Sequence, residues 1–437
     1  MAKCPRDKLD RIRELLNNNK VTQAKKLLST IDPSNLGPYD RGYYYYLAAR
    51  FDYFNGNYRV QNVNRALRLL KPHVERDDLY HWALYVKGVL FWRSHQLKRA
   101  AAIFKQLEHE ATQAGHYLVE ASTLQQLGQY VAATGQPGKA EEYFSRAIDR
   151  YCVEGVKQER RATIHNRAMW LARYGLFSQS QGIYLADPVS VEEWGGRLTI
   201  SYTLNQAFNL ALRRRVKEAL HMLQMYYDSR RADAAQNQIF YVNRGVALLM
   251  AGRYEEALED LYQALDTGLK SHHATMAQVY KWIACCHIWM GSLRWARQYA
   301  RRALGLALRS SECLEIGGAY FVLGWADAVE RDLRYMDPVK ASIYAMRAKA
   351  NIILALREFG DIGACWDLAM VQYRAAHLGI FPTRQNTRLV RLAKRYFRSE
   401  GIRPPSEWAA TRKRLGQSIQ EAGKEKKRQL KKLLDLD

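Results

Sequence analysis

Small and apolar side chains recur along the chain at the spacing of paired helices. One set of small residues returns at intervals of 40, 40, 39, 38 and 39 positions, and a second set stands twelve positions before the first. The first set is Ala100, Ala140, Ser180, Ala219, Ala257 and Ala296. The second set is Gly88, Gly128, Ala168, Ala207, Gly245 and Ala284. A double register of this kind indicates an internal repeat of about 39 residues.

The residues between and after the small positions predict a helix, a turn and a second helix in each repeat. Large or apolar residues stand four positions after the first set, which places them on the same helical face. They are Phe104, Phe144, Tyr184, Leu223, Leu261 and Ala300. No segment alternates apolar and polar residues between turn signals, so the sequence predicts an all-α fold without sheets.

A turn residue lies seven positions after each member of the second set. Glycine occupies this position in four repeats, as Gly135, Gly175, Gly252 and Gly291. Glycine lets the chain leave a helix in the left-handed conformation and begin the next one. His95 and Arg214 occupy the position in the other two repeats, so we expect those turns to close differently.

One repeat carries most of a known motif. Its residues are Leu124, Leu127, Gly128 and Val131, followed by Ala140, Phe144 and Ala147. This pattern resembles the tetratricopeptide repeat (TPR), although the period of about 39 is longer than the 34 residues of that family. Long repeats of this sort are similar to the repeat domains of bacterial regulators such as the maltose-type activators and the peptide-pheromone receptors. The resemblance implies a right-handed superhelical solenoid of antiparallel helix pairs.

The predicted solenoid covers most of the chain. Weaker copies of the repeat extend it over residues 1–380 as about nine to ten helix pairs, with the best match at 83–305 and a last pair expected over 351–377. Because one pair cannot bury its apolar face alone, neighbouring pairs must supply the core. Residues 381–437 are expected to form a separate basic helical tail.

The net charge widens the range of possible partners. The 437 residues include 67 Lys and Arg against 43 Asp and Glu, a net charge of +24, and the tail alone holds 16 basic and 6 acidic residues. A surplus of this size favours acidic partners such as nucleic acid or acidic protein segments. The possible polyanion contacts are Arg391, Lys394, Arg395, Arg398, Arg412, Lys413 and Arg414.

A packing role for the tail is the alternative. An apolar stripe of Leu389, Leu392, Ala393 and Tyr396 could cover the exposed end of the last repeat, while the basic residues keep the protein soluble. The sequence leaves both interpretations open.

Side-chain amides form the clearest candidate binding site. The position two residues before the second set holds Gln126, Asn166, Asn205 and Asn243 in four consecutive repeats. In the family that the chain resembles, this position faces the concave groove and its Asn binds a peptide backbone. An amide has one acceptor and two donors, so a ladder of amides can satisfy an extended chain whatever its sequence. Asn is also common at this position without a ligand. The flanking repeats carry Val86, Trp282 and Val322 there.

Two aromatic clusters are candidate interface anchors. Trp282, Trp289 and Trp295 fall in one repeat, and four consecutive tyrosines occupy 43–46. Because several of these residues recur at helical spacing, packing between helices is the favoured interpretation.

No motif in the sequence predicts catalysis or metal binding. Cys285 and Cys286 precede His287, but adjacent helical residues point about 100° apart and cannot both reach one ion, so we expect buried thiols. No cofactor and no metal are expected. Six cysteines without a CxxC pair fit reduced thiols in a cytoplasm, and no apolar run approaches the roughly 18 residues that membrane insertion requires.

The sequence therefore favours a scaffold or regulator that is not an enzyme and that binds a peptide or protein segment, possibly acidic, in its concave groove. The alternative is a regulatory protein associated with nucleic acid, which uses its basic tail and arginine-rich helices.

Overall fold

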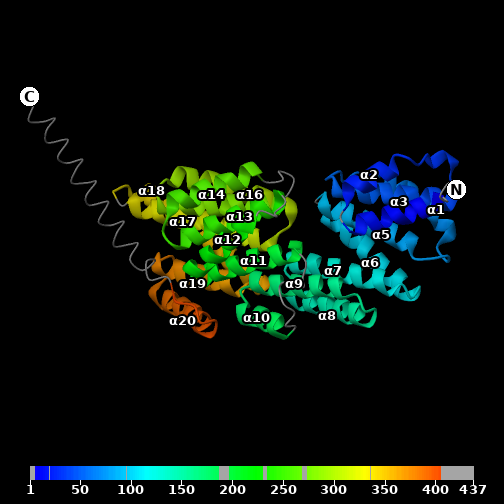
Figure 1. Ribbon diagram of the computed structural model, residues 1–437. Helices are drawn as coiled ribbons and strands as arrows, with labels where there is room; N and C mark the ends of the chain where they lie inside the picture. The colour runs from blue at the N-terminus through cyan, green and yellow to red at the C-terminus, as the bar shows by residue number, and fades with distance from the viewer. Residues whose placement is uncertain are drawn as a thin grey trace, which may run out of the picture. The chain divides into compact units, whose positions relative to one another are not determined.

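The computed structural model describes residues 5–18, 20–94, 96–186, 196–229, 234–267, 273–334 and 336–404. Within these ranges every regular element is a helix, so the prediction of an all-α fold is confirmed (Figure 1). The α-helices are α1 (Pro5–Asn17), α2 (Val21–Leu28), α3 (Pro38–Phe54), α4 (Gln61–Leu70), α5 (Leu79–Arg93), α6 (Leu97–Gln113), α7 (Tyr117–Ala133), α8 (Pro137–Val153), α9 (Lys157–Arg173), α10 (Phe177–Ala186), α11 (Gly196–Leu212), α12 (Val216–Ser229), α13 (Ala234–Met250), α14 (Tyr254–Thr267), α15 (His273–Trp289), α16 (Leu293–Ser310), α17 (Cys313–Leu333), α18 (Pro338–Ile362), α19 (Cys365–His377) and α20 (Thr383–Ser399). Two short 3-10 helices, η1 (Pro33–Asn35) and η2 (Lys71–His73), lie beside α3 and α4.

Consecutive helices pack as pairs, and the pairs stack. Odd-numbered helices contact the even-numbered helices that follow them, as α13 contacts α14, α15 contacts α16 and α17 contacts α18. The first helices of successive pairs also contact one another, α11 with α13, α13 with α15 and α15 with α17. This is the arrangement of a TPR-like solenoid, as the repeat pattern predicts. Its right-handed superhelical sense stays a prediction.

The chain divides into two compact units, which are described separately. Unit 1 comprises residues 1–132 and 136–167, and unit 2 comprises residues 133–135 and 168–437. The largest hydrophobic core of unit 2 runs continuously from Ala172 to Ile402, and a second core, in unit 1, runs from Leu9 to Leu90.

The small residues of the repeat lie where paired helices approach most closely. A Cβ atom added to Gly88 would lie 2.5 Å from Cε1 of Phe104, and one added to Gly128 would lie 2.9 Å from Cε1 of Phe144. In a third repeat the Ser180 hydroxyl donates to the carbonyl of Ala168, 2.8 Å away, which joins the two small positions directly. The predicted helix contacts are therefore confirmed.

The turn position adopts the left-handed conformation that the sequence suggests. Gly135, Gly175, Gly252 and Gly291 have φ angles between 76° and 84°. Arg214 has φ 63° in the same position, so the expectation that its turn closes differently is wrong. The backbone hydrogen bond from the following Arg215 N–H to the Leu210 carbonyl, 2.8 Å long, closes this turn as the equivalent bond closes the glycine turns. His95 lies outside the described residues.

The end of the solenoid differs from the expectation in its pairing. The pair expected over 351–377 contains two helices that contact each other, but the first of them is the second half of α18, which begins at Pro338 and pairs with α17. α19 pairs instead with α20, which comes from the segment expected to begin the basic tail. Ala393 and Phe397 on α20 are fully buried in the core of unit 2.

The packed face of α20 includes three of the four residues of the predicted stripe, because Ala393 is buried and Leu389 and Tyr396 are half-buried. Leu392 is 38% exposed, whereas Phe397, which the predicted stripe omits, is buried. The described part of the tail thus packs onto the last repeat, and residues 405–437 lie outside the described residues.

We predict that Gly128→Leu lowers the free energy of unfolding by about 1–3 kcal/mol, because the new side chain must displace the Phe144 ring. Gly138→Leu is the control, since no atom lies within 4 Å of a Cβ added to this residue in α8. Urea unfolding followed by circular dichroism measures both variants. Equal effects at the two positions would contradict close packing at Gly128.

Candidate functional site

A cavity of about 300 Å³ opens on the face of unit 2 that its first helices form. Lining residues come from α15 and α17, from the ends of α13 and α18, from the Arg214 turn, from the start of α14 and from α19. The residues are Arg214, Leu249, Met250, Ala251, Tyr254, Lys281, Trp282, Cys285, Trp289, Gly318, Phe321, Val322, Trp325, Phe359, Trp366, Asp367 and Met370. We refer to this cavity as the unit 2 pocket.

The C-terminal helix pair completes the unit 2 pocket by folding back onto the start of the unit. The Cys365 N–H donates to the Tyr174 carbonyl at 2.8 Å, and the Trp366 indole N–H donates to the Leu212 carbonyl at 3.3 Å. The Tyr396 hydroxyl donates to the Gly175 carbonyl at 2.6 Å. The first turn of α19 therefore meets the end of α11, although more than 150 residues separate them in the sequence (Figure 1).

Aromatic side chains form most of the wall. The rings of Tyr254 and Trp289 stack with centroids 5.6 Å apart, and Trp289 meets Trp325 edge to face at 5.4 Å. The buried guanidinium of Arg374 lies 4.3 Å from the Trp325 ring centroid, which is a cation–π contact. The wall is thus rigid and apolar, with positive charge behind it.

The three tryptophans that the sequence singles out have different environments. Trp282 is 7% exposed and Trp289 is half-buried, and both line the unit 2 pocket. Trp295 on α16 is 51% exposed and lies outside it. In unit 1, Tyr43 and Tyr46 are buried, as the packing interpretation predicts.

Charged side chains lie at one side of the apolar wall. The Lys281 ammonium group is 2.7 Å from a carboxylate oxygen of Glu315, and both side chains are almost completely buried. A Cβ added to Gly318 would lie 2.5 Å from Cδ of Lys281, so the lysine stem crosses α17 where a glycine leaves room for it. Asp367 on α19 lines the pocket next to this pair.

Burial changes the protonation of the carboxyl on α19. It raises the pKa of Asp367 to about 7, while Lys281 and Arg173 favour the ionised form and Glu315 opposes it. The pocket therefore holds one carboxyl group that gains or loses its proton near neutral pH. Sequence reasoning missed Lys281 and Asp367; the signal available was a lysine inside the otherwise apolar stretch of α15.

Unit 1 has a cavity of similar size and different chemistry. Its volume is about 290 Å³, and it is lined by Arg50, Tyr53, Phe54, Tyr85, Val86, Val89, Trp92, Arg93, Gln126 and Gln129. Arg93 donates to the Tyr53 hydroxyl at 3.2 Å. The lining of this cavity thus combines aromatic rings with the guanidinium groups of two arginines.

The sequence position that holds the predicted amides lines a cavity in each unit, although other residues occupy it in some repeats. Val86 and Gln126 line the cavity of unit 1, and Trp282 and Val322 line the unit 2 pocket. All four stand two residues before a small residue of the first helix. This position therefore marks the face of the first helices on which a cavity opens in each unit.

The four predicted amides lie in different surroundings. Gln126 donates to the Tyr85 hydroxyl at 3.3 Å, and Asn166 and Asn205 are half-buried. Asn243 is 4% exposed, and its amide donates to the Leu204 carbonyl of the preceding repeat at 2.7 Å. Asn243 thus links α13 to α11, and this differs from the solvent-facing amide that the ladder requires. Peptide binding by the four amides stays a prediction.

Arginines of the central repeats make ion pairs with nearby carboxylates. Arg167 pairs with Glu141 in unit 1. In unit 2, Arg244 lies 2.5 Å from Asp260. Arg173 lies 3.6 Å from Glu312 and 3.7 Å from Glu315. These contacts neutralise charge that an acidic ligand would otherwise meet.

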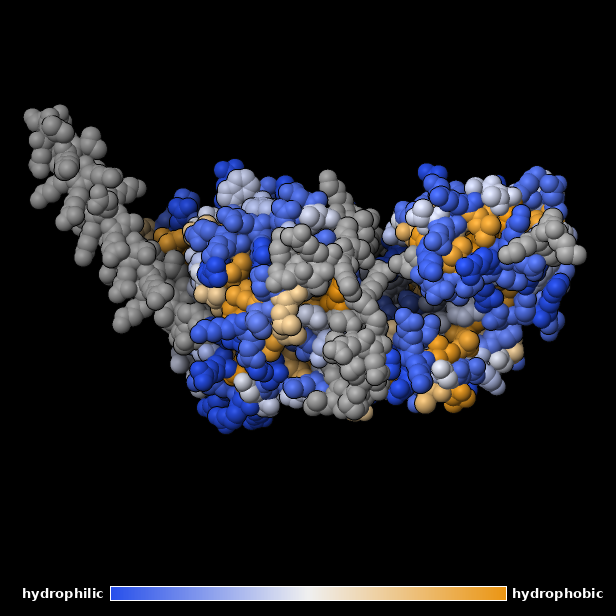
Figure 2. Space-filling model, viewed as in Figure 1, coloured by the Kyte–Doolittle hydropathy of each residue, from blue (hydrophilic) through white to orange (hydrophobic). Residues whose placement is uncertain are grey.

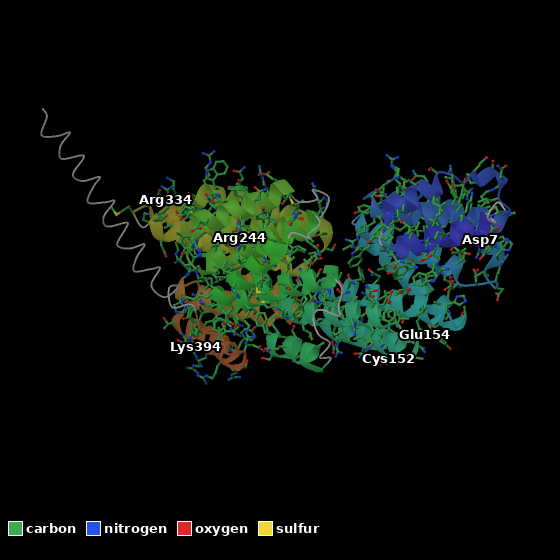
Figure 3. All side chains as sticks on the ribbon, viewed as in Figure 1. Asp7, Cys152, Glu154, Arg244, Arg334 and Lys394 are labelled. Carbon is green, nitrogen blue, oxygen red and sulfur yellow. The ribbon has the colours of Figure 1, made fainter. Side chains whose placement is uncertain are left out.

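The basic residues predicted on α20 lie on its outer face. Arg391, Lys394, Arg395 and Arg398 are exposed, and Lys394 extends away from the neighbouring helices (Figure 3). Arg412, Lys413 and Arg414 lie outside the described residues. Binding of polyanions by this surface stays a prediction.

The cysteine pair behaves as the sequence predicts. Cys285 and Cys286 are buried, and burial raises the pKa of Cys285 to about 12. Within the described ranges no three His, Cys, Asp or Glu side chains come together in a group suited to a metal ion. No helix in the described part of the chain has the length and apolarity needed to cross a membrane.

The chain is similar to several solved structures at low sequence identity. No family model and no curated protein matches the chain. A Rap protein complexed with competence and sporulation factor shares 13% identity with a TM-score of 0.43, over 90% of this chain and 99% of that chain. NprR in complex with its cognate peptide NprX shares 14% identity with a TM-score of 0.46, over 91% and 97%. A tetratricopeptide repeat protein from Parabacteroides merdae shares 14% identity with a TM-score of 0.41, over 64% and 99%.

We predict that Asn243→Ala lowers the free energy of unfolding by about 1–2 kcal/mol, because it removes a buried hydrogen bond between two repeats. Asn62→Ala, which removes a side-chain hydrogen bond of similar length to Asp52 in a half-buried position, is the control and should cost less. Chemical denaturation checks both. An unchanged stability of Asn243→Ala would show that the amide is free to serve a ligand.

We also predict that protonation of Asp367 makes stability depend on pH. The folded pKa of about 7 lies above the ordinary value of 3.8, so between these values the folded protein binds more protons than the unfolded chain. Stability from this group is therefore lost as the pH rises from about 4 to about 7. Asp367→Asn lacks this titrating group and does not lose that stability. The difference in Tm between Asp367→Asn and wild type should therefore increase by at least about 2 °C as the pH rises from about 4 to about 7.

Differential scanning calorimetry at several pH values measures this effect. Asp361→Asn is the control, because the Asp361 side chain is 70% exposed. A Tm difference between Asp367→Asn and wild type that does not change with pH would contradict the raised pKa.

Proposed function

We propose that this protein is a regulator or scaffold that binds a peptide or protein segment, and that an apolar anchor side chain of this ligand occupies the unit 2 pocket. The observation that carries the proposal is a preformed hollow on the first-helix face with aromatic walls and one charged side. Binding sites are typically concave, mostly apolar and provided with a few converging polar groups.

The size of the pocket supports an anchor rather than a whole ligand. A volume of about 300 Å³ is at the lower end of small-molecule pockets and suits one or two large side chains. Burial of an aromatic or large aliphatic side chain against Trp289, Phe321 and Trp325 would contribute most of the affinity, as anchors do in other interfaces.

The charged side of the pocket supports a ligand with polar groups next to the anchor. Lys281 and Asp367 offer a donor and a carboxyl whose protonation varies near neutral pH. The backbone of a peptide provides both donors and acceptors beside every side chain. We propose that these groups meet the ligand backbone, and that the amide of Asn205 in the same unit contacts another part of an extended ligand. Peptide contacts by Gln126 and Asn166, which belong to unit 1, are a separate prediction.

Selection of ligands from a library of random 12-residue peptides displayed on phage tests the proposal with the full chain. Selected peptides should share a large apolar residue, and Trp289→Ala should weaken their binding by about 30-fold or more, because it removes one wall of the pocket. Fluorescence polarisation with labelled peptides measures the dissociation constants.

Trp295→Ala is the matched control, because Trp295 belongs to the same repeat, is 51% exposed and lies outside the pocket. Its peptide affinity should equal that of wild type. Peptides that bind Trp289→Ala as tightly as wild type, in a variant whose circular dichroism is unchanged, would overturn the assignment of the site.

A further inference from the structure

Helix α18 presents an apolar stripe to solvent. Met336, just before the helix, is 80% exposed, Val339 is 71%, Ile343 is 45%, Met346 is 63% and Ile353 is 46% exposed. Ala350 is also exposed. These positions follow one another at spacings of 3, 4, 3, 4 and 3 residues, which is the heptad spacing of a coiled-coil seam. Figure 2 shows hydrophobic surface beside α18.

The exposed stripe lies opposite the face by which α18 packs into unit 2. Its buried residues are Ala348, Ile352, Ala355, Phe359 and Ile362, which also follow heptad spacing. Met346 and Ala348 are two positions apart, which is about 200° around the helix. A helix that is apolar on two opposite faces is typically covered on both.

Two of the basic side chains beside the stripe have carboxylate partners within the chain. Arg347 lies 3.4 Å from the buried Asp327, and Lys340 lies 2.9 Å from Asp337. Beyond the end of the stripe Arg357 lies 3.6 Å from Asp361. The exposed Lys349 also borders the stripe, so the border of this face is basic at this position and largely paired elsewhere.

The stripe is complementary to itself. When two coiled-coil helices run antiparallel about a two-fold axis, a positions of one helix meet d positions of the other. An axis between Ile343 and Met346 pairs each apolar residue with another: Met336 with Ile353, Val339 with Ala350, and Ile343 with Met346. Arg357, the next position of the heptad, stays outside this register.

The exposed area is that of a small dimer interface. The large apolar side chains of the stripe, with the adjacent Leu354, leave about 600 Å² exposed per chain, so complete coverage by a second copy would bury up to about 1,200 Å² in total, at the lower limit for specific interfaces. We propose that a second copy of this chain covers the stripe, and that the protein forms a weak symmetric dimer through antiparallel α18 helices.

Sedimentation equilibrium of the full chain from about 1 μM to about 200 μM tests the dimer. Wild type should shift from the monomer mass towards twice that mass, and Met346→Glu should stay monomeric. Met225→Glu is the matched control, because Met225 on α12 is also 63% exposed and lies outside the stripe. Thermal melts at concentrations where wild type is monomeric should be unchanged in both variants, because both side chains are exposed.

Wild type that stays monomeric throughout overturns the proposal, as does a Met346→Glu variant that dimerises like wild type. Loss of the dimer in both variants would also overturn it, since the interface would not then depend on the stripe.

Oxidative cross-linking tests the register. The double variant Val339→Cys with Ala350→Cys should form a covalent dimer beyond the wild-type background, because these positions face each other across the axis. The single variant Val339→Cys should not, since the two copies of residue 339 would lie about 16 Å apart along the helices. Cross-linking by the single variant would overturn the antiparallel arrangement.

Discussion

The unit 2 pocket depends on the contact between the Gly175 turn and the first turn of α19. A Cβ atom added to Gly175 would lie 2.4 Å from the Trp366 backbone nitrogen, so no other residue permits this approach without a shift of the backbone. The same glycine has φ 81°, a conformation that other residues rarely adopt. Gly175 thus forms the turn of its own helix pair and also provides the contact surface for a helix that begins nearly 200 positions later.

The electrostatics of the pocket follow from that closure. Because α19 folds back, Asp367 comes to lie near Lys281 and Glu315, and three ionisable groups share a region with little water. Separation from water penalises each charge unless a partner compensates it. The ion pair of Lys281 and Glu315 satisfies one pair of charges, and the remaining carboxyl responds by a raised pKa. A ligand that fills the pocket would meet this carboxyl directly.

The sequence predicts what is repeated and local. Helix pairs, close contacts such as Gly128 against Phe144, and left-handed turns all follow from a register that recurs every 39 residues or so. It does not predict the return of α19 onto the Gly175 turn, because a contact between distant segments leaves no periodic trace. It also places the amide of Asn243 in a groove, whereas the structure uses that amide to join two neighbouring repeats, because the register does not say whether an amide faces solvent or the adjacent helix. The sequence offers the packed stripe of α20 as one of two open interpretations, but it does not predict that α20 pairs with α19, because it assigns α19 to a pair with the residues before it.

The central claim is that a bound peptide occupies the unit 2 pocket, and hydrogen–deuterium exchange of the full chain with a selected peptide tests it most directly. The account predicts slower exchange in α15, α17 and the first turns of α19, the helices that supply most of the lining, with α20 unchanged. Slower exchange confined to unit 1 or to α20, with α15, α17 and α19 unaffected, would contradict the account.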